Sequence, residues 1–234
     1  MSETPLPHVL ITGGSRGIGR AIARDLGRDH HILVGGTRAE TVDPVVAELP
    51  SAQPFICDLA DPAATAEAVA GLDRLDVLIN SAGVGSRGPS SIGEAPRAEW
   101  RRVLEIDVVA VADLTRMVLP LLRARRGDVV MINSGSGLNR PGPGGGIYAA
   151  AKYALRALTD ALREEERGRV RVTSIHPGRV DTDMQVELQA GSGRRYVPSE
   201  HLRPESVAAA VRLALTASEE AMVEELSIRP VHKL

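Results

Sequence analysis

A tyrosine and a lysine stand four residues apart in the stretch GGGIYAAAKYALRAL, residues 144–158. On a helix, Tyr148 and Lys152 would share one face and lie within reach of each other. A free tyrosine hydroxyl has a pKa of roughly 10, and a lysine ammonium beside it favours the phenolate and lowers that pKa. Such a pair could move a proton to a carbonyl oxygen while a hydride reaches the carbon. Because Tyr-x-x-x-Lys also occurs by chance on solvated helix faces, the setting of the pair decides its meaning.

Two serines precede this pair at the end of an apolar run. Ser134 and Ser136 follow DVVMIN, residues 128–133, and Ser134 lies 14 residues before Tyr148. Open α/β sheets bind ligands at the carboxyl edge of their strands, where a serine hydroxyl could hydrogen-bond a substrate carbonyl. Tyr153 lies off the face that holds Tyr148 and Lys152, and we interpret it as a packing residue.

A glycine-rich turn lies between an apolar run and a helical pattern near the N-terminus. The stretch HVLITGGSRGIGRAIARDL, residues 8–26, holds Gly13, Gly17 and Gly19 in the spacing TGxxxGxG. Without Cβ atoms the backbone can turn tightly and approach a pyrophosphate, which binds the unpaired N–H groups of a helix N-terminus. A purely structural turn is the alternative, but the position at the first strand–helix junction favours a dinucleotide site.

The end of the second expected strand indicates which dinucleotide is bound. An acidic residue there favours NAD, whereas a basic residue favours the 2′-phosphate of NADP. In LVGGTRAET, residues 33–41, Gly36 occupies the expected acidic position and is followed by Thr37 and Arg38, while Arg16 lies in the glycine turn. Two cations and no carboxylate favour NADP(H) over NAD(H), although solvated surface arginines are the alternative.

Short apolar runs that alternate with longer helical patterns must position these residues. The runs span 8–12, 31–35, 54–57, 75–80, 128–133, 170–175 and 224–228. Several are apolar throughout, as is typical of parallel strands covered on both faces. The alternation predicts an α/β fold: one single-domain Rossmann fold over 1–234, with a doubly wound parallel sheet of about seven strands flanked by helices.

Helix candidates lie between these runs. The first has Ile18, Ile22 and Leu26 on one face, and another begins at Asp61-Pro62, with Asp as N-cap. A long pattern over 97–125 could be broken and carries Pro120 late. The helix of Tyr148 continues to about Glu166, with Gly168 as its stop and Leu155, Leu158 and Leu162 as its apolar face, and the last helix covers about 204–217.

The region 181–203 is long and shows no periodicity. Within it, 183–203 is either a substrate loop or an ordinary surface loop. Arg194 and Arg195 in this loop could favour an anionic substrate, although solvated arginines are the more common case.

Composition limits the classes of function. The net charge of −2 argues against nucleic-acid binding. The one cysteine, Cys57, excludes an intrachain disulfide and is interpreted as a small buried hydrophobe. No secretory signal and no apolar run of 18 residues is found, so we expect no membrane span and a cytoplasmic location. No metal site is expected.

Six elements, in order and at matching spacings, resemble the short-chain dehydrogenase/reductase family across essentially the whole chain. They are TGGSRGIG (12–19), CDL (57–59), NSAG (80–83), the serine that ends VVMINS (129–134), YAAAK (148–152) and HPGRVDT (176–182). The resemblance implies that Tyr148 is the general acid/base and that Lys152 lowers its pKa and binds the nicotinamide ribose. Ser134, preferred to Ser136 because Gly137 follows at the family's offset, would polarise the substrate carbonyl.

The resemblance also implies the cofactor contacts. Asp58 would bind the adenine amino group. The segment 80–83 would line the adenosine side and support the central strand, and 177–182 would contact the nicotinamide end. The implied set is Gly13, Ser15, Arg16, Gly17, Ile18, Gly19, Thr37, Arg38, Asp58, Leu59, Asn80, Ala82, Gly83, Tyr148, Lys152, Pro177, Gly178, Val180 and Thr182.

One position departs from the family pattern. The family often has a catalytic asparagine in the long helix before the serine strand, where it holds a helix distortion whose carbonyl binds a water leading to the lysine. Here WRRVLEIDVVAVADLTRMVLP, residues 100–120, has Asp107 at that position. We expect Asp107 to keep the water relay and to favour the charged form of Lys152, shifting the pH optimum. The alternative is that only the backbone matters.

The resemblance implies an NADPH-dependent reduction of a carbonyl to an alcohol, or the reverse, on a small-molecule substrate. A non-catalytic NADP(H)-binding sensor is the alternative, but such proteins typically lose the tyrosine or the lysine. The spacing of YAAAK does not fit enoyl reductases, and Lys152 with the glycine turn does not fit halohydrin dehalogenases. A homo-dimer or homo-tetramer is implied, built through the long helix and the alanine-rich helix after YAAAK.

Overall fold

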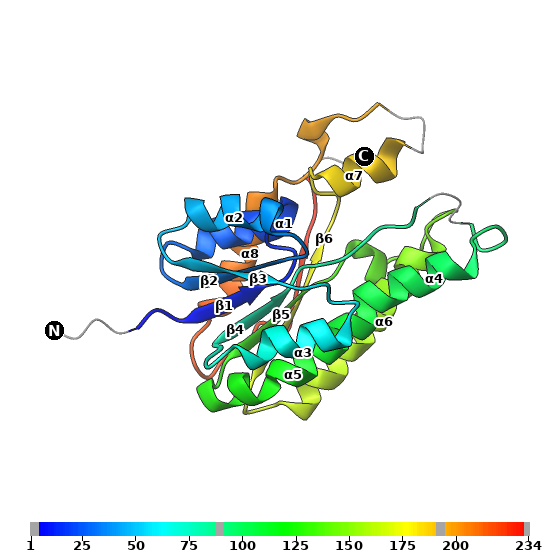
Figure 1. Cartoon of the computed structure of the whole chain (residues 1–234). Coiled ribbons are helices and arrows are strands. Elements are labelled where there is room, and N and C mark those ends of the chain that lie inside the picture. The colour runs from blue at the N-terminus through cyan, green and yellow to red at the C-terminus, as the bar shows by residue number, and fades with distance from the viewer. Residues whose placement is uncertain (1–4, 88–90, 191–194, 232–234) are drawn as a thin grey trace.

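The computed structural model describes residues 5–87, 91–190 and 195–231, and within them seven parallel strands form one sheet. The strand order is β3-β2-β1-β4-β5-β6-β7, so the chain begins in the middle of the sheet and winds outward in both directions (Figure 1). The strands are β1 His8–Ile11, β2 His31–Gly36, β3 Ala52–Ile56, β4 Val77–Asn80, β5 Asp128–Ile132, β6 Arg171–Pro177 and β7 Glu225–Ile228. The expected doubly wound α/β fold is confirmed.

The helices cover both faces of this sheet (Figure 1). One face carries α1 (Gly17–Leu26), α2 (Ala39–Glu48) and α8 (Pro204–Leu215). The other carries α3 (Pro62–Ala70), α4 (Arg97–Leu104), α5 (Ala110–Arg125) and α6 (Gly146–Glu165). The central strands β1, β4 and β5 are almost wholly buried as a result, which explains their uninterrupted apolar sequences.

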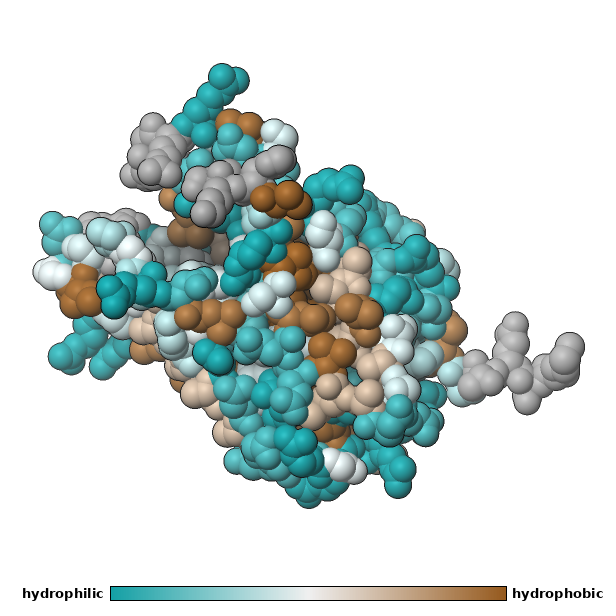
Figure 2. Space-filling view, turned by 180° about the vertical axis from the view of Figure 1, so that it is seen from behind, coloured by the Kyte–Doolittle hydropathy of each residue, from teal (hydrophilic) through white to brown (hydrophobic). Residues whose placement is uncertain are grey.

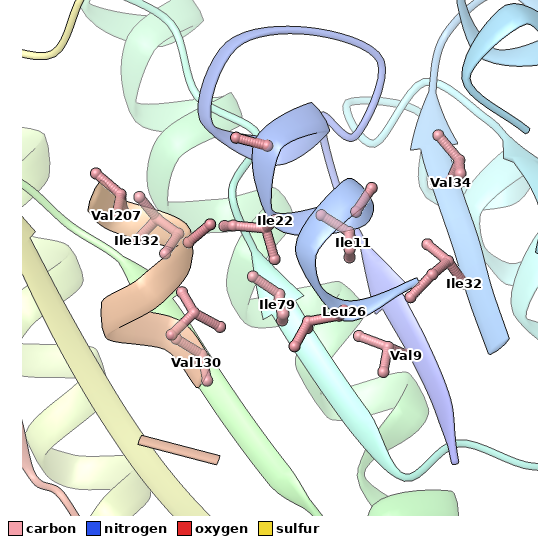
Figure 3. Packing of buried hydrophobic residues seen from close by; sticks show 14 of the residues in the cluster. Val9, Ile11, Ile22, Leu26, Ile32, Val34, Ile79, Val130, Ile132 and Val207 are labelled. Atoms are coloured by element: carbon pink, nitrogen blue, oxygen red, sulfur yellow. The ribbon is translucent and has the colours of Figure 1, made fainter. Parts of the chain in front are cut away.

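Each face of the sheet has its own apolar core. On the first, Ile22 and Leu26 of α1 and Val207 of α8 point into the side chains of the central strands (Figure 3). On the second, Leu114 of α5 and Leu155 of α6 are fully or nearly fully buried against the sheet. These cores fix the strand ends, and with them the residues that follow each strand.

The long pattern over 97–125 is broken, but not by Pro120. A π-helical turn, η1 (Glu105–Val109), separates α4 from α5, and Pro120 lies inside α5. A π-turn holds an extra residue that slips the helical period by one position, and such turns are frequent at functional sites. This turn contains Asp107.

Two helices are absent from the sequence-based expectations. The first, α2, contains Pro44, which weakens its helical pattern. The second, α7 (Asp183–Ala190), lies in the region expected to be aperiodic, followed by a short 3-10 turn, η3 (Pro198–Glu200). Val186 and Leu188 of α7 are both exposed, so this helix shows no single apolar face. Arg194 lies outside the described residues, and Arg195 is exposed.

Other local expectations are confirmed. Asp61 accepts hydrogen bonds from the backbone N–H groups of Ala63 and Ala64 as N-cap of α3. Gly168 adopts a φ of +78° after the end of α6, a conformation that favours glycine. Cys57 is buried, as expected.

Tyr153 is not a packing residue of this chain, because its side chain is 42% exposed on α6. Val109 of η1 is 50% exposed. On the side of the molecule opposite to the view of Figure 1, hydrophobic residues form a band between hydrophilic ones (Figure 2).

Within the part of the chain that the structure describes, none of the helices has the length and apolarity needed to cross a membrane.

Candidate active site

The glycine turn between β1 and α1 builds an anion-binding cradle. Gly13 and Gly17 have φ values of +63° and +52°, in the left-handed region that favours glycine. A Cβ on Gly19 would lie 2.2 Å from the carbonyl oxygen of Gly13, so any side chain there would push the turn apart. Arg16, the N-cap residue of α1, makes no side-chain capping bond. The first N–H groups of α1 are therefore left for a ligand such as a pyrophosphate.

A cavity of about 460 Å³ lies over this turn. The ends of β2 and β3, the segment after β4 and the start of α7 form its other walls. Of the expected cofactor residues, the lining contains Gly13, Ser15, Arg16, Gly17, Ile18, Gly19, Thr37, Asp58, Leu59, Ala82, Gly83 and Thr182. It also contains residues that sequence reasoning did not single out, among them Thr12, Val84, Arg87, Ile106, Asp183 and Met184.

Seven expected cofactor residues lie off this lining, among them Tyr148 and Lys152 of α6. Arg38 is exposed at the start of α2, Gly178 is partly exposed, and Pro177 and Val180 are buried. Asn80 is 3% exposed, and its amide donates to the Thr115 hydroxyl at 3.1 Å. The Asn80 side chain points into the core of this structure, where it connects β4 to α5. A contact of Asn80 with the adenosine side stays a prediction.

Thr12, at the end of β1, fixes the segment that follows β4. Its hydroxyl oxygen accepts hydrogen bonds from the backbone N–H groups of Ser81 at 3.0 Å and Ala82 at 2.9 Å. Farther along, Gly85 lies against α7, since a Cβ on it would be 3.0 Å from the Leu188 side chain. Residues 81–85 are therefore held between β1 and α7, with one side open to the cavity.

The π-turn η1 carries Asp107 into the interior, where its side chain is fully buried. Its Oδ1 accepts a hydrogen bond from the backbone N–H of Val84 at 2.7 Å. Its Oδ2 lies 3.2 Å from Nζ of Lys152, which is 4% exposed. Among the described residues, this ammonium is the one partner of Oδ2. The expected negative charge beside Lys152 is therefore present as a direct ion pair.

This ion pair sets the charge state of the lysine. Burial by itself lowers the pKa of Lys152, but the Asp107 carboxylate, together with Tyr148, outweighs it and holds that pKa above its ordinary value. On the same face of α6, Nζ lies 5.5 Å from the centre of the Tyr148 ring. The structure thus places a charged lysine between a buried carboxylate and a half-buried tyrosine.

Ser134 follows β5 and begins a short 3-10 turn, η2 (Gly135–Gly137). Its hydroxyl oxygen accepts a hydrogen bond from the Ser136 N–H at 3.1 Å. A Cβ on Gly137 would lie 2.8 Å from the carbonyl oxygen of Lys152, so only glycine allows this turn to pack directly on α6. The close approach brings the serine turn against the helix of Tyr148 and Lys152.

Gly83 connects the cavity with these side chains. It lines the cavity, and a Cβ on it would lie 3.4 Å from Oδ2 of Asp107 and 3.5 Å from Nζ of Lys152. Ser134, Tyr148, Lys152 and Asp107 themselves lie off the lining. The cavity and the side chains that could do chemistry are therefore adjacent, with a single glycine between the cavity and the ion pair.

The cavity fits a dinucleotide. A glycine cradle on a free helix N-terminus suits a pyrophosphate, and the cationic Arg16 lies at its edge. The end of β2 contributes Gly35, Gly36 and Thr37 to the wall, without a carboxylate. Asp58, after the neighbouring strand β3, is exposed and lines the cavity, where it can accept a hydrogen bond from an adenine amino group.

Comparison with known proteins agrees with this geometry. The chain is 29% identical to the serine 3-dehydrogenase of Rhizobium radiobacter, over 96% of this chain and 94% of the relative. It is 28% identical to the NADP-dependent 3-hydroxy acid dehydrogenase of Schizosaccharomyces pombe, over 100% and 96%.

Solved structures show the same architecture. An alcohol dehydrogenase from the archaeon Thermococcus sibiricus, complexed with 5-hydroxy-NADP, superposes with a TM-score of 0.86 at 28% identity, covering 97% of this chain and 98% of the other. A 3-oxoacyl-[acyl-carrier protein] reductase from Brucella melitensis with bound NAD gives a TM-score of 0.81 at 28% identity, covering 97% and 90%.

The family model described as short chain dehydrogenase matches residues 7–193, which is most of the chain. The relatives are dehydrogenases and reductases. The protein therefore belongs to the short-chain dehydrogenase/reductase family, and is an oxidoreductase that acts on CH–OH groups.

Proposed function

We propose that this enzyme interconverts a carbonyl and an alcohol on a small molecule with NADP(H), using Tyr148 as the general acid/base. The observation that carries the proposal is the buried Lys152 ammonium. It lies 5.5 Å from the Tyr148 ring on α6, which also packs against the turn of Ser134. The Lys152 ammonium lies beside the cavity that fits the dinucleotide, with Gly83 between them.

In the reducing direction, the Ser134 hydroxyl donates a hydrogen bond to the substrate carbonyl and so polarises it. Tyr148 gives its hydroxyl proton to the carbonyl oxygen, and the Lys152 ammonium stabilises the tyrosinate that remains. The nicotinamide cofactor supplies the hydride. In the oxidising direction, the tyrosinate takes the proton from the alcohol.

We further infer a preference for NADP(H) over NAD(H). Arg16 lines the cavity at the glycine turn, and the wall formed by the end of β2 holds no carboxylate that would repel a 2′-phosphate. The name of the S. pombe relative states NADP dependence, whereas the B. melitensis structure holds NAD, so the preference must be measured on this chain.

The test is NADPH oxidation by the purified chain with a panel of ketones, aldehydes and 3-oxo acids. Tyr148→Phe removes the proton donor and should abolish turnover while NADPH still binds. Tyr153→Phe, a change of the same kind on the exposed side of α6, is the matched control and should keep full activity. Full activity in Tyr148→Phe would overturn the mechanism. NADPH binding without turnover on any substrate would instead support the non-catalytic sensor.

Two further expectations accompany this function. A homo-oligomer is consistent with the exposed side chains of Val109 and Tyr153 on the outer surface of η1 and α6. The measurement that decides it is the mass of the particle in solution. A cytoplasmic location rests on the sequence and can be checked by fractionation of cells that express the chain.

A further inference from the structure

A buried imidazole outside the proposed mechanism lies directly behind the serine turn. His176 is the sixth residue of β6 and is fully buried, although histidine is only moderately frequent in protein interiors. A buried polar ring needs hydrogen-bond partners, and those of His176 show what it holds in place.

Its Nδ1 lies 3.1 Å from the carbonyl oxygen of Ser134. A carbonyl oxygen can only accept, so Nδ1 carries the hydrogen and donates it. Nε2 of the neutral ring is then an acceptor, and it lies 2.9 Å from the hydroxyl of Ser174, which donates to it. The Ser134 carbonyl therefore fixes the tautomer, and the Ser174 hydroxyl, which can donate or accept, is compatible with it.

The charged groups around this ring agree with the neutral form. Burial lowers the pKa of His176 more than the Ser134 carbonyl and the Glu225 carboxylate raise it, and Arg156 and Arg229 lower it further. Glu225 lies 3.4 Å from Nε2, but it is partly exposed and also lies 3.7 Å from Arg156.

The backbone of His176 is held as well. Its carbonyl oxygen accepts a hydrogen bond from the Arg229 guanidinium. The same guanidinium lies against Gly135 of the serine turn, since a Cβ on Gly135 would be 3.1 Å from it. The chain then continues into Pro177 and Gly178, where Gly178 donates to the Ile228 carbonyl at 2.7 Å. One residue thus connects the turn of Ser134 to the start of the 177–182 segment.

We propose that His176 is a positioning residue, which holds the Ser134 turn in register with the 177–182 segment through its Nδ1–H bond to the Ser134 carbonyl. The inference rests on the proposed role of Ser134 and adds a residue that never touches substrate. The backbone at Ser134 is then fixed on both sides: its N–H donates to the Asn133 side chain at 2.9 Å, and its carbonyl accepts from His176. Misplacing a reacting group by about 1 Å can cost on the order of a hundredfold in rate.

The test compares substitutions that keep or remove one donor. In His176→Asn, the amide nitrogen can take the place of Nδ1 and restore the bond, whereas His176→Gln places its amide farther out and His176→Leu has no donor. We expect kcat to fall roughly tenfold or more in the Leu and Gln variants and to recover largely in the Asn variant. NADPH affinity should change much less than kcat in all three, because the glycine turn that holds the pyrophosphate lies on α1. His31→Leu, at the amino end of β2, is the control for loss of a histidine in this sheet.

Combining the substitutions with Ser134→Ala separates positioning from general damage. If His176 acts through Ser134, His176→Leu adds no further loss of kcat to Ser134→Ala, because the group it positions is already gone. An equal loss in both backgrounds, or equal losses in the Asn and Leu variants, would overturn the inference. If Ser134→Ala itself kept full activity, the proposed role of the serine would fail instead, so the two failures are distinguishable. Should the Leu variant not fold, the comparison of Asn with Gln decides.

Discussion

Oδ2 of Asp107 lies 3.2 Å from Nζ of Lys152, and both side chains are buried. A carboxylate at this position gives the lysine a fixed counter-ion, where an asparagine would give it only a dipole. The other oxygen of Asp107 binds the Val84 N–H, so the same side chain ties the lysine to the segment that lines the cofactor cavity. Position 107 therefore affects both the charge of Lys152 and the shape of the cavity wall.

Asp107→Asn should narrow the pH range of activity from the alkaline side. Asp107 holds the pKa of Lys152 above its ordinary value, so the charged lysine is present below that pKa and is lost as the pH rises through it. Without the carboxylate, burial lowers the pKa of Lys152, and the lysine loses its proton at a lower pH. We expect the alkaline limb of kcat/KM to move to lower pH.

Asp113→Asn is the matched control, because it removes the same charge from a residue on α5 that pairs with the exposed Arg116. Its pH profile should follow that of the wild type. If the Asp107→Asn profile also overlays the wild type, only the backbone of η1 matters and the side-chain charge has no role.

Lys152→Met should lower the free energy of unfolding as well as the activity. The change leaves the Asp107 carboxylate buried without its counter-ion, and loss of one partner of a buried pair costs roughly 3–5 kcal/mol. The double variant Asp107→Asn/Lys152→Met replaces both charges with neutral groups and should recover part of this loss. Urea unfolding near neutral pH gives the free energy of unfolding of the wild type, the single variant and the double variant. Equal stability of the single and double variants would show that the pair does not contribute in this way.

The sequence was sufficient to predict the sheet and the helical spacing of the residues proposed to do the chemistry. Short runs rich in apolar residues marked all seven strands. The central strands β1, β4 and β5 gave the most uniform runs, because parallel strands covered on both faces have no polar side. The helical spacing of Tyr148 and Lys152 is realised on α6, and the glycine turn opens α1 as expected.

What the sequence could not show depends on contacts between distant positions. The bond from His176 to the Ser134 carbonyl spans 42 residues, and those from Ser81 and Ala82 to Thr12 span 69 and 70. No local pattern marks such a pairing. The contact of the Asn80 side chain with Thr115, 35 residues away, is of the same kind. The helix α7 was not expected because its apolar residues show no single helical face, and Val186 and Leu188 are exposed.

Arg16→Ala should weaken NADPH binding far more than NADH binding. Arg16 lines the cavity at the glycine turn, and its nearest carboxylate, Asp183, is 3.9 Å away on an exposed surface, so it is available to a 2′-phosphate. A charge-assisted hydrogen bond is worth about 1.5–3 kcal/mol, which corresponds to a loss of roughly tenfold or more in NADPH affinity. Arg20→Ala removes an arginine of the same helix that pairs with Glu48, and should change neither affinity. Equal weakening of both cofactors by Arg16→Ala would contradict the proposed preference.

Thr12→Val should loosen the cavity wall while keeping the shape of the side chain. The hydroxyl oxygen of Thr12 accepts from two backbone N–H groups, those of Ser81 and Ala82, and valine leaves both without this partner. An unsatisfied buried donor costs about 1–3 kcal/mol, so unfolding should occur at lower urea concentration and NADPH should bind more weakly. Thr12→Ser keeps the oxygen and should restore both properties. If the serine variant is as weakened as the valine variant, packing at this position is responsible, and the two hydrogen bonds do not hold the segment in place.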